Sequence, residues 1–225
     1  ITCRDWSSDV CSSDLVLVDL PGTGLSDTAE DLKKNLGVDI RFLEQDLIDP
    51  YGPLKIRDWI VSQGIYLYIL INNAGVSYNK LFLDSTMEEN ENLLNLNILS
   101  TVKMTRTVLP LFSSPGNGFV LNVSSLSAFY PMPYMPVYAS SKSFVLNFTL
   151  ALRAELLRKG ISVSALCPNG VKTNPECRAK IAAQGLAGRV FCHDAEFVAR
   201  EGIKGLFNNK AVIIPGWPNR LLGAL

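Results

Sequence analysis

Short apolar runs alternate with helical patterns along most of this chain. Leu15–Leu20 (LVLVDL) is a nearly continuous apolar run interrupted by one acid, which is typical of a strand buried on both faces. After it, Leu25, Ala29, Leu32 and Leu36 recur at helical spacing. Strands separated by helices form right-handed β-α-β units. The sequence therefore predicts an α/β fold, a doubly wound parallel sheet with helices on both faces.

The same alternation continues toward the C-terminus. We expect further strands at Val38–Leu43, Tyr66–Ile71, Phe119–Val123, Ile161–Leu166 and Ala211–Ile214. We expect further helices at Pro53–Gly64, Met87–Phe112, Tyr138–Arg158 and Glu196–Phe207. In the first helix, Ser26 is a candidate N-cap and Gly37 stands just past the end. Ligands of such sheets bind outside the carboxyl ends of the strands, so the informative residues should follow the strands.

Composition excludes several classes of protein. The 225 residues are 48% hydrophobic, which suits one domain with a sizeable core. Lysine and arginine (21) balance aspartate and glutamate (21), which argues against a nucleic-acid partner held through phosphates. The five cysteines lack metal-ligand spacing, so we expect no metal site, and free thiols indicate a reducing cytoplasm.

Polar residues do follow the expected strands. Asn72-Asn73-Ala74-Gly75 follows the third, Ser124 and Ser125 follow the fourth, and Pro168-Asn169-Gly170-Val171-Lys172-Thr173 follows the fifth. Tyr138 and Lys142 share one face at the start of a helix. An ammonium one turn away favours the phenolate, so we expect Lys142 to lower the pKa of Tyr138. Such a tyrosine can exchange a proton with a carbinol or carbonyl, and the Ser125 hydroxyl can bond the same oxygen.

These motifs together resemble the short-chain dehydrogenase/reductase family, from about Leu15 to the end of the chain. The resemblance rests on NNAG, the NVSS segment that ends at Ser125, YASSK and PNGVKT. It implies hydride transfer between NAD(H) or NADP(H) and an alcohol or carbonyl. It makes Tyr138 the general acid/base, with Ser125 orienting the substrate oxygen and Lys142 also binding the nicotinamide ribose. It further makes Asn97 (in LNLNILS) the structural asparagine that holds a water in the proton relay.

The resemblance also places the cofactor. It puts Asp46 and Leu47 near the adenine ring. It puts Asn72, Asn73, Ala74 and Gly75 along the adenosine side, and Pro168, Gly170, Val171 and Thr173 at the nicotinamide amide. The family usually has glycine directly after that proline, where this chain has Asn169. Asparagine tolerates positive φ better than most residues, so we expect Asn169 to be accommodated.

The acid of the first run predicts the cofactor preference. Asp19 ends LVLVD, where a carboxylate can accept hydrogen bonds from both ribose hydroxyls and repel a 2′-phosphate. No arginine follows nearby to receive a phosphate. We therefore expect NAD(H) to be preferred, with NADP(H) as the alternative. A strand-end acid that simply faces water is the competing interpretation.

The phosphate loop is not evident. Gly22-Thr23-Gly24 resembles one, but it lacks the third glycine, and only two strand candidates precede Tyr66–Ile71 where the resemblance needs three. We therefore expect LVLVDL to be the second strand, and the first strand, glycine-rich loop and first helix to be missing. Residues up to about Leu15 show neither the helical nor the strand periodicity of apolar residues. They resemble one translated reading frame of a sequencing adapter. We expect residues 1–15 to be non-native and 16–225 to form one incomplete domain.

Three functions stay open at this point. The first is an oxidoreductase, and the second is a catalytically inert fragment or a non-catalytic member that uses the same fold for binding. The third, a hydrolase using Ser125 and His193, lacks a G-x-S-x-G elbow. The apolar segment Phe129–Pro136 has three equally favoured interpretations: a wall for a lipophilic substrate, a part of the core, or a dimer contact. The resemblance also implies a homodimer or homotetramer through the two long helices.

Overall fold

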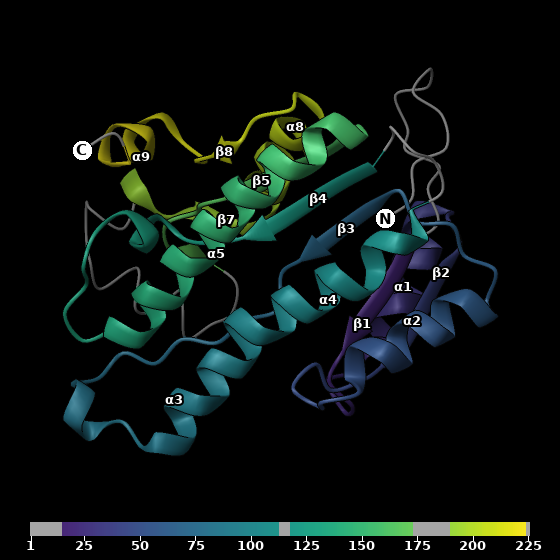
Figure 1. Ribbon diagram of the computed structural model, residues 1–225, viewed down its shortest axis with the longest axis horizontal. Helices are drawn as coiled ribbons and strands as arrows, with labels where there is room; N and C mark the ends of the chain where they lie inside the picture. The colour runs from purple at the N-terminus through teal and green to yellow at the C-terminus, as the bar shows by residue number, and fades with distance from the viewer. Residues whose placement is uncertain (1–14, 113–117, 173–189, 224–225) are drawn as a thin grey trace.

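The computed structural model describes residues 15–112, 118–172 and 190–223. Two parallel sheets dominate it (Figure 1). One consists of β1 (Leu15–Asp19) and β2 (Ile40–Glu44). The other has the order β3-β4-β5-β8, formed by Ile69–Asn72, Gly118–Val123, Ile161–Leu166 and Val212–Ile213. A short parallel pair joins β6 (Val171–Lys172) to β7 (His193–Asp194).

Helices connect these strands. They are α1 (Leu25–Leu36), α2 (Gly52–Ser62), α3 (Met87–Leu94), α4 (Ser100–Val108), α5 (Pro136–Leu156), α8 (Ala195–Phe207) and α9 (Trp217–Leu222). The predicted α/β fold with parallel strands is confirmed, and most expected boundaries shift by three residues or fewer. Within the described ranges, no helix is long and apolar enough to cross a membrane.

Two expectations about helices are wrong. Ser26 does not cap α1, because the helix already begins at Leu25 and its N-cap is Gly24, at φ 76°. The region Met87–Phe112 is not one α-helix, since a π-helical turn at Asn95–Leu99 separates α3 from α4. Gly37 does end α1 in the left-handed conformation, as expected, with its N–H donating to the Lys33 carbonyl.

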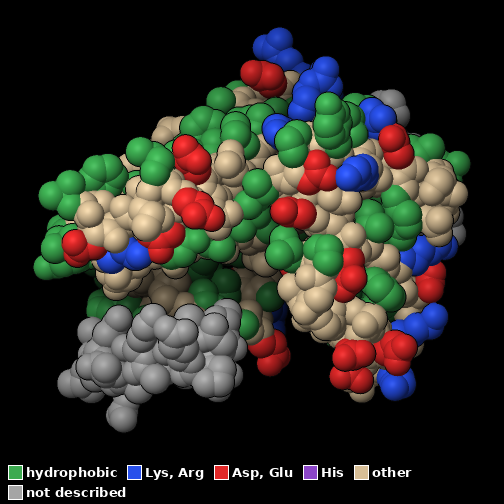
Figure 2. Space-filling view, turned by 90° about the horizontal axis from the view of Figure 1, so that it is seen from below, with side chains coloured by type: hydrophobic (Ala, Val, Ile, Leu, Met, Phe, Trp, Pro, Cys, Tyr) green, Lys and Arg blue, Asp and Glu red, His purple; other side chains and the backbone are tan. Residues whose placement is uncertain are grey.

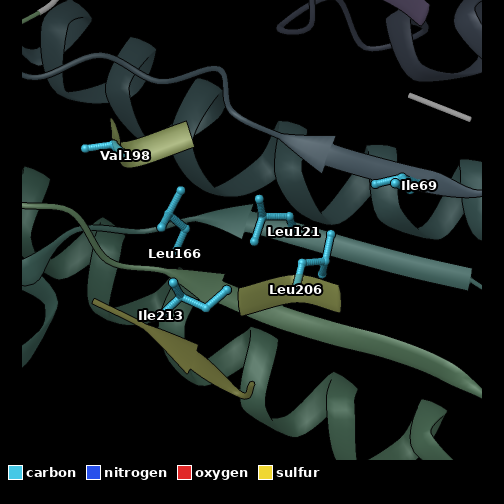
Figure 3. Packing of buried hydrophobic residues seen from close by; sticks show 6 residues of the cluster. All are labelled: Ile69, Leu121, Leu166, Val198, Leu206 and Ile213. Atoms are coloured by element: carbon cyan, nitrogen blue, oxygen red, sulfur yellow. The ribbon is translucent and has the colours of Figure 1, made fainter. Parts of the chain in front are cut away.

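The two faces of the larger sheet are buried against different helices. On one face, Leu121 and Leu166 of the sheet pack with Val198 and Leu206 of α8 (Figure 3). On the other face, Val120 and Val163 pack with Leu152 and Leu156 of α5. Alternate residues of each strand point to opposite faces, so a strand buried on both faces is largely apolar, and the polar side chains within it need hydrogen-bond partners. This explains the runs FVLNV and ISVSAL.

A separate apolar cluster joins the two sheets. It contains Ile56 and Ile60 of α2, Leu67, and Met104 and Val108 of α4. Val18 and Leu43 of the smaller sheet pack against it, and so does Leu70 of the larger one. We call these eight residues the bridging cluster. Since β1 and β3 are not paired, this cluster carries the contact between the sheets.

Leu206 offers a direct test of the core. It is fully buried, so Leu206→Ala should lower the free energy of unfolding by about 2–5 kcal/mol through lost burial and a residual cavity. Leu157→Ala, at a side chain 51% exposed, is the matched control and should cost less than about 0.5 kcal/mol. Urea unfolding followed by circular dichroism measures both. Equal losses in the two variants would contradict the packing described.

Candidate active site

The first turns of α5 carry the two residues expected to do acid–base chemistry. Tyr138 and Lys142 lie one turn apart, and the Lys142 Nζ is 5.8 Å from the centroid of the tyrosine ring. Ser125 lies just past the end of β4, and its side chain hydrogen-bonds that of Tyr138. The structure therefore brings together three residues that are separated by up to 17 positions in the sequence, as predicted.

Lys142 is fixed to the end of β4. Its side chain is only 5% exposed, and its Nζ donates to the Val123 carbonyl at 2.9 Å. Its own carbonyl accepts from the Ser124 Oγ at 2.7 Å. Two hydrogen bonds thus hold this turn of α5 against the strand that delivers Ser125.

Asn97 ties the loop after β3 to α5. It lies in the π-helical turn and is 1% exposed. Its Oδ1 accepts from the Val76 N–H at 2.9 Å, and its Nδ2 donates to the Val76 carbonyl at 3.0 Å and to the Ser141 Oγ at 3.1 Å. A π-helical turn inside a helix commonly marks a functional position.

Neighbouring side chains approach position 75 so closely that only glycine fits there. A Cβ atom at this position would lie 3.0 Å from the Asn97 Oδ1 and 3.3 Å from the Lys142 Nζ. The end of the NNAG motif therefore packs directly against two of the expected catalytic residues, which explains why a glycine stands there.

A buried polar network runs beneath the site, and the sequence analysis missed it. Asn72 Nδ2 donates to the Thr105 Oγ1 at 2.9 Å and to the Asn122 Oδ1 at 2.8 Å. Asn122 Nδ2 then donates to the Thr149 Oγ1 at 3.0 Å. This network links β3, β4, α4 and α5. The signal that was available is an asparagine inside the apolar run FVLNV, since a buried amide needs partners.

Burial dominates the ionisation of the pair. Burial raises the pKa of Tyr138, and the hydrogen bond with Ser125 only partly offsets this. Burial also lowers the pKa of Lys142 to about 8. The expectation that Lys142 lowers the pKa of Tyr138 is wrong for this structure, because the Nζ bonds to the Val123 carbonyl and burial opposes the phenolate.

The shifted lysine predicts how stability depends on pH. Between pH 8 and 9 the folded protein loses a proton from Lys142 while the unfolded chain, with a pKa near 10.5, keeps it. At this residue the unfolded state then binds more protons, so Lys142 contributes a rise in stability with pH of about 1 kcal/mol over this interval. Burial raises the pKa of Cys167 to about 12, which acts in the opposite direction. Urea unfolding at several pH values measures the slope. Lys142→Met should make it less positive, and an unchanged slope in this variant would contradict the assignment.

Five of the residues expected near the adenosine lie around one cavity, which Asp46 and Gly75 do not line. Asp19, Leu47, Asn72, Asn73 and Ala74 all line a hollow of about 340 Å³ between the two sheets. Asp19 is exposed, with Oδ1 accepting from the Leu20 N–H at 2.8 Å. Asp46, two residues past the end of β2, is only partly buried, and its Oδ1 accepts from the Ile48 N–H at 2.8 Å.

The expected nicotinamide residues lie past the end of β5. The Pro168 carbonyl accepts from the Leu126 N–H at 2.8 Å, and the Gly170 carbonyl accepts from the His193 N–H at 3.0 Å. Val171 begins β6. Thr173 lies outside the described residues.

Asn169 is accommodated for a reason other than the expected one. It is not among the residues with positive φ. Instead its Oδ1 accepts from the Gly170 N–H at 2.9 Å, and its Nδ2 donates to the Asn219 Oδ1 at 3.2 Å. Its side chain therefore joins the loop after β5 to α9.

The structure does not support a hydrolase built on Ser125 and His193. The His193 Nε2 is buried without a hydrogen-bond partner among the described residues, and the ring packs on Phe197. The Ser125 Oγ instead accepts from the Ser127 N–H at 3.2 Å and interacts with Tyr138. Nor do the described ranges contain a cluster of three or more His, Cys, Asp or Glu side chains able to hold a metal.

The aromatic and proline-rich segment lines a hollow of its own. Residues 128–133 and the first turns of α5 surround a space of about 560 Å³, and neither Ser125 nor Tyr138 lines it. Phe129 and Tyr130 are 37% and 38% exposed, which is too open for core residues. A core role for this segment is therefore wrong for these two side chains, and substrate or dimer contact stays a hypothesis.

Comparison with known proteins identifies the family. A family model described as "short chain dehydrogenase" matches residues 12–182. This chain belongs to the short-chain dehydrogenase family. A mouse relative, "17-beta-hydroxysteroid dehydrogenase type 3", is 34% identical over 163 residues, which are 71% of this chain and 52% of the relative. A zebrafish relative, "Very-long-chain 3-oxoacyl-CoA reductase-B", is 33% identical over 165 residues, again 71% and 52%. The chain thus spans about half the length of these relatives.

A solved short-chain dehydrogenase from Sphingobium yanoikuyae, in complex with NADPH, has the same fold. It superposes with a TM-score of 0.78 at 29% identity, over 94% of this chain and 83% of that one. In this chain, the NNAG motif at the end of β3 and the YASSK motif at the start of α5 meet at one site, where Gly75 approaches Lys142.

Proposed function

We propose that this protein is an NAD(P)-dependent oxidoreductase that transfers a hydride between a nicotinamide and an alcohol or carbonyl. The observation that carries the proposal is the convergence of Ser125, Tyr138 and Lys142 at the carboxyl end of β4. An inert fragment or a non-catalytic member would not need these three side chains together. The bound nicotinamide would supply or accept the hydride.

The residues of the chain would handle the proton. Tyr138, protonated because burial raises its pKa, would donate its phenolic proton to a carbonyl oxygen during reduction and accept one during oxidation. Ser125 would hydrogen-bond the same oxygen and hold it in place. Lys142 would position Tyr138 and bind the nicotinamide ribose. Asn97 would hold a relay water beside the loop that it already anchors through Val76.

The residues present fit most of the cofactor. The exposed carboxylate of Asp19 suits the adenosine ribose, and the cavity beside it is lined by Asn72, Asn73 and Ala74. The described residues offer no matching site for the pyrophosphate of the cofactor. Gly22 and Gly24 follow β1 and lead into α1, but the third glycine of a phosphate-binding loop is absent there. We propose that the first strand, phosphate loop and first helix belong to the complete enzyme, that residues 1–15 are non-native, and that 16–225 form an incomplete domain.

Asp19 supports NAD(H) as the preferred cofactor, with NADP(H) as the alternative. In a chain completed with a strand–turn–helix segment, Asp19→Ser should lower the ratio of NADH to NADPH affinity about tenfold or more, because a hydrogen-bonding charge is lost. Fluorescence titration of the two reduced cofactors measures the ratio. Asp27→Ser, at an exposed acid in the first turn of α1, is the matched control and should leave the ratio unchanged.

We propose a lipophilic carbonyl or alcohol as the substrate. The names of the mouse and zebrafish relatives refer to a hydroxysteroid and a long-chain 3-oxoacyl-CoA, both carbonyl or carbinol compounds with large apolar parts. The apolar hollow of residues 128–133 fits such a substrate or a subunit contact. We also propose a homodimer or homotetramer in the cytoplasm, without a nucleic-acid partner. Figure 2 shows charges of both signs interspersed on one face, consistent with the zero net charge.

Tyr138→Phe tests the mechanism. In the completed chain it should reduce kcat by about a thousandfold or more while leaving NADH affinity within about twofold, because only the phenolic proton is lost. Turnover is followed by NADH absorbance with a hydroxysteroid or 3-oxoacyl-CoA substrate. Tyr66→Phe, at a tyrosine that is 71% exposed and lines neither hollow, is the matched control. Retained turnover in Tyr138→Phe would refute the assignment.

The 225-residue chain itself should bind cofactor weakly. Without a phosphate loop, the pyrophosphate lacks the backbone N–H groups that normally hold it. We expect isothermal titration with NADH to give a dissociation constant above about 100 µM, the range left when a main anchoring group is lost. Micromolar binding would show that no such loop is needed.

A further inference from the structure

The turn that leads into α5 has an unusual backbone. Among the described residues, only Tyr134 and Asn209 adopt a positive φ without being glycine, and Tyr134 does so at φ 67°. Asparagine tolerates this conformation, whereas a bulky aromatic residue rarely adopts it. The Tyr134 side chain is 57% exposed, so side-chain packing does not explain why the strained conformation persists. Strain of this kind persists only where the surrounding structure holds the residue in place.

The sequence of this turn suits a tight bend, except for the tyrosine. The Met135 N–H donates to the Met132 carbonyl at 3.3 Å, which closes a four-residue turn with Pro133 and Tyr134 at its centre. Proline at the first central position and a positive φ at the second are features of a type II turn. Glycine normally takes the second position, because it adopts a positive φ without strain. Tyr134 therefore carries strain that glycine would avoid.

A main-chain hydrogen bond from another part of the chain holds this turn. The Lys80 N–H, in the loop after β3, donates to the Tyr134 carbonyl at 2.9 Å. At the start of α5 itself, the N-cap Met135 makes no side-chain capping bond within the described part of the chain. Tyr138 stands in the first turn of α5, so the position of its side chain depends on how the chain enters the helix.

An ion pair fixes Lys80. Its Nζ donates to both oxygens of the Glu89 carboxylate, at 2.6 Å and 2.8 Å. Glu89 is fixed in turn, because its Oε2 accepts from the Thr86 N–H at 2.9 Å and its own N–H donates to the Thr86 Oγ1 at 3.1 Å. This capping box anchors the pair to the start of α3. The two side chains of the pair are only 34% and 29% exposed, so salt screens their attraction less than that of an exposed pair.

The same residues pack around Tyr138. The helix α3 lies beside the first turns of α5 (Figure 1). Lys80, Tyr134 and Tyr138, together with Leu93 of α3, line a hollow of only about 20 Å³, which has room for about one water. The packing here is therefore close, and a movement of the turn would reach the phenol ring of Tyr138.

We propose that Lys80 and Glu89 are positioning residues for Tyr138. Their ion pair holds the Lys80 N–H on the carbonyl of the strained Tyr134, and this bond fixes the entry of the chain into α5. Without the pair, Tyr134 would relax to a negative φ, and the first turn of α5 would carry Tyr138 away from Ser125. The consequence for catalysis rests on the proposed function, whereas the positioning of the phenol does not.

NMR spectroscopy tests the positioning on the 225-residue chain. Tyrosine labelled with ¹³C at Cζ reports the ionisation of each phenol, and Tyr138→Phe assigns the signal of Tyr138. Burial raises the pKa of Tyr138 in the unsubstituted chain. Lys80→Met should move this pKa back toward 10, because the displaced ring becomes more exposed to water. Arg200→Met removes an ion pair of α8 whose side chains are 69% and 84% exposed, so it is the matched control and should leave the pKa unchanged.

Tyr134→Gly separates positioning from a general loss of stability. Proline followed by glycine forms a type II turn without strain, so the turn should no longer need the pair. In the Tyr134→Gly background, Lys80→Met should therefore leave the pKa of Tyr138 where that background sets it. Equal shifts in both backgrounds, or a shift in neither, would overturn the proposal. Should Lys80→Met fail to fold, Glu89→Gln supplies the same comparison, since it removes the charge of the pair and keeps an acceptor for the Thr86 N–H.

Turnover of the completed chain supplies the second readout. Lys80→Met should lower kcat about tenfold or more and leave the KM for NADH within about twofold, because the proton donor is displaced while the adenosine site is untouched. Lys80→Arg keeps a cation for Glu89 and should lose less than about threefold in kcat. An unchanged kcat in Lys80→Met would contradict the proposal. A completed chain without any turnover would instead contradict the proposed function, and the NMR comparison would then decide the positioning.

Discussion

The apolar contact between the two sheets is the interaction on which the rest of the structure depends. Among the described residues, no main-chain pairing joins the smaller sheet to the larger one, so the bridging cluster holds them together. Apolar burial is non-directional, and it can keep two sheets adjacent without fixing their register. The contact also sets Asp19 and Asn72 around one cavity, and both residues are proposed to contact the adenosine.

Near the expected catalytic residues, hydrogen bonds rather than apolar contacts fix the relative positions of the elements. Asn97, Ser124 and Asn122 each hydrogen-bond groups on other elements, with partners on the loop after β3, on α5 and on β3. These bonds lie in the buried interior, where an unpartnered polar group would cost about 1–3 kcal/mol. They therefore fix the relative positions of β3, β4 and α5. In consequence, the expected catalytic set is ordered although the sheet that would carry the rest of the cofactor is divided.

The sequence alone predicted the class of fold and the three residues that converge at the end of β4. Both rest on local signals: apolar runs predict buried strands, and Tyr138 and Lys142 share a helix face. Three features could not be predicted. The π-helical turn depends on the long-range bonds of Asn97 with Val76 and Ser141. The raised pKa of Tyr138 depends on burial, and the Asn72–Asn122–Thr149 chain depends on which strands are neighbours. The described strands form two separate main sheets, and the missing first strand that the strand count suggests stays a prediction.

The central claim is that this site transfers a hydride under control of the Tyr138 proton. The most direct measurement uses NADH deuterated at C4 on the transferred face, the chain completed by a strand–turn–helix segment, and a hydroxysteroid-type ketone. The account predicts that the carbinol carbon of the product carries the deuterium, while its hydroxyl proton comes from solvent. Cofactor that binds without any transfer of deuterium to carbon, or product labelled at carbon from the solvent, would contradict it.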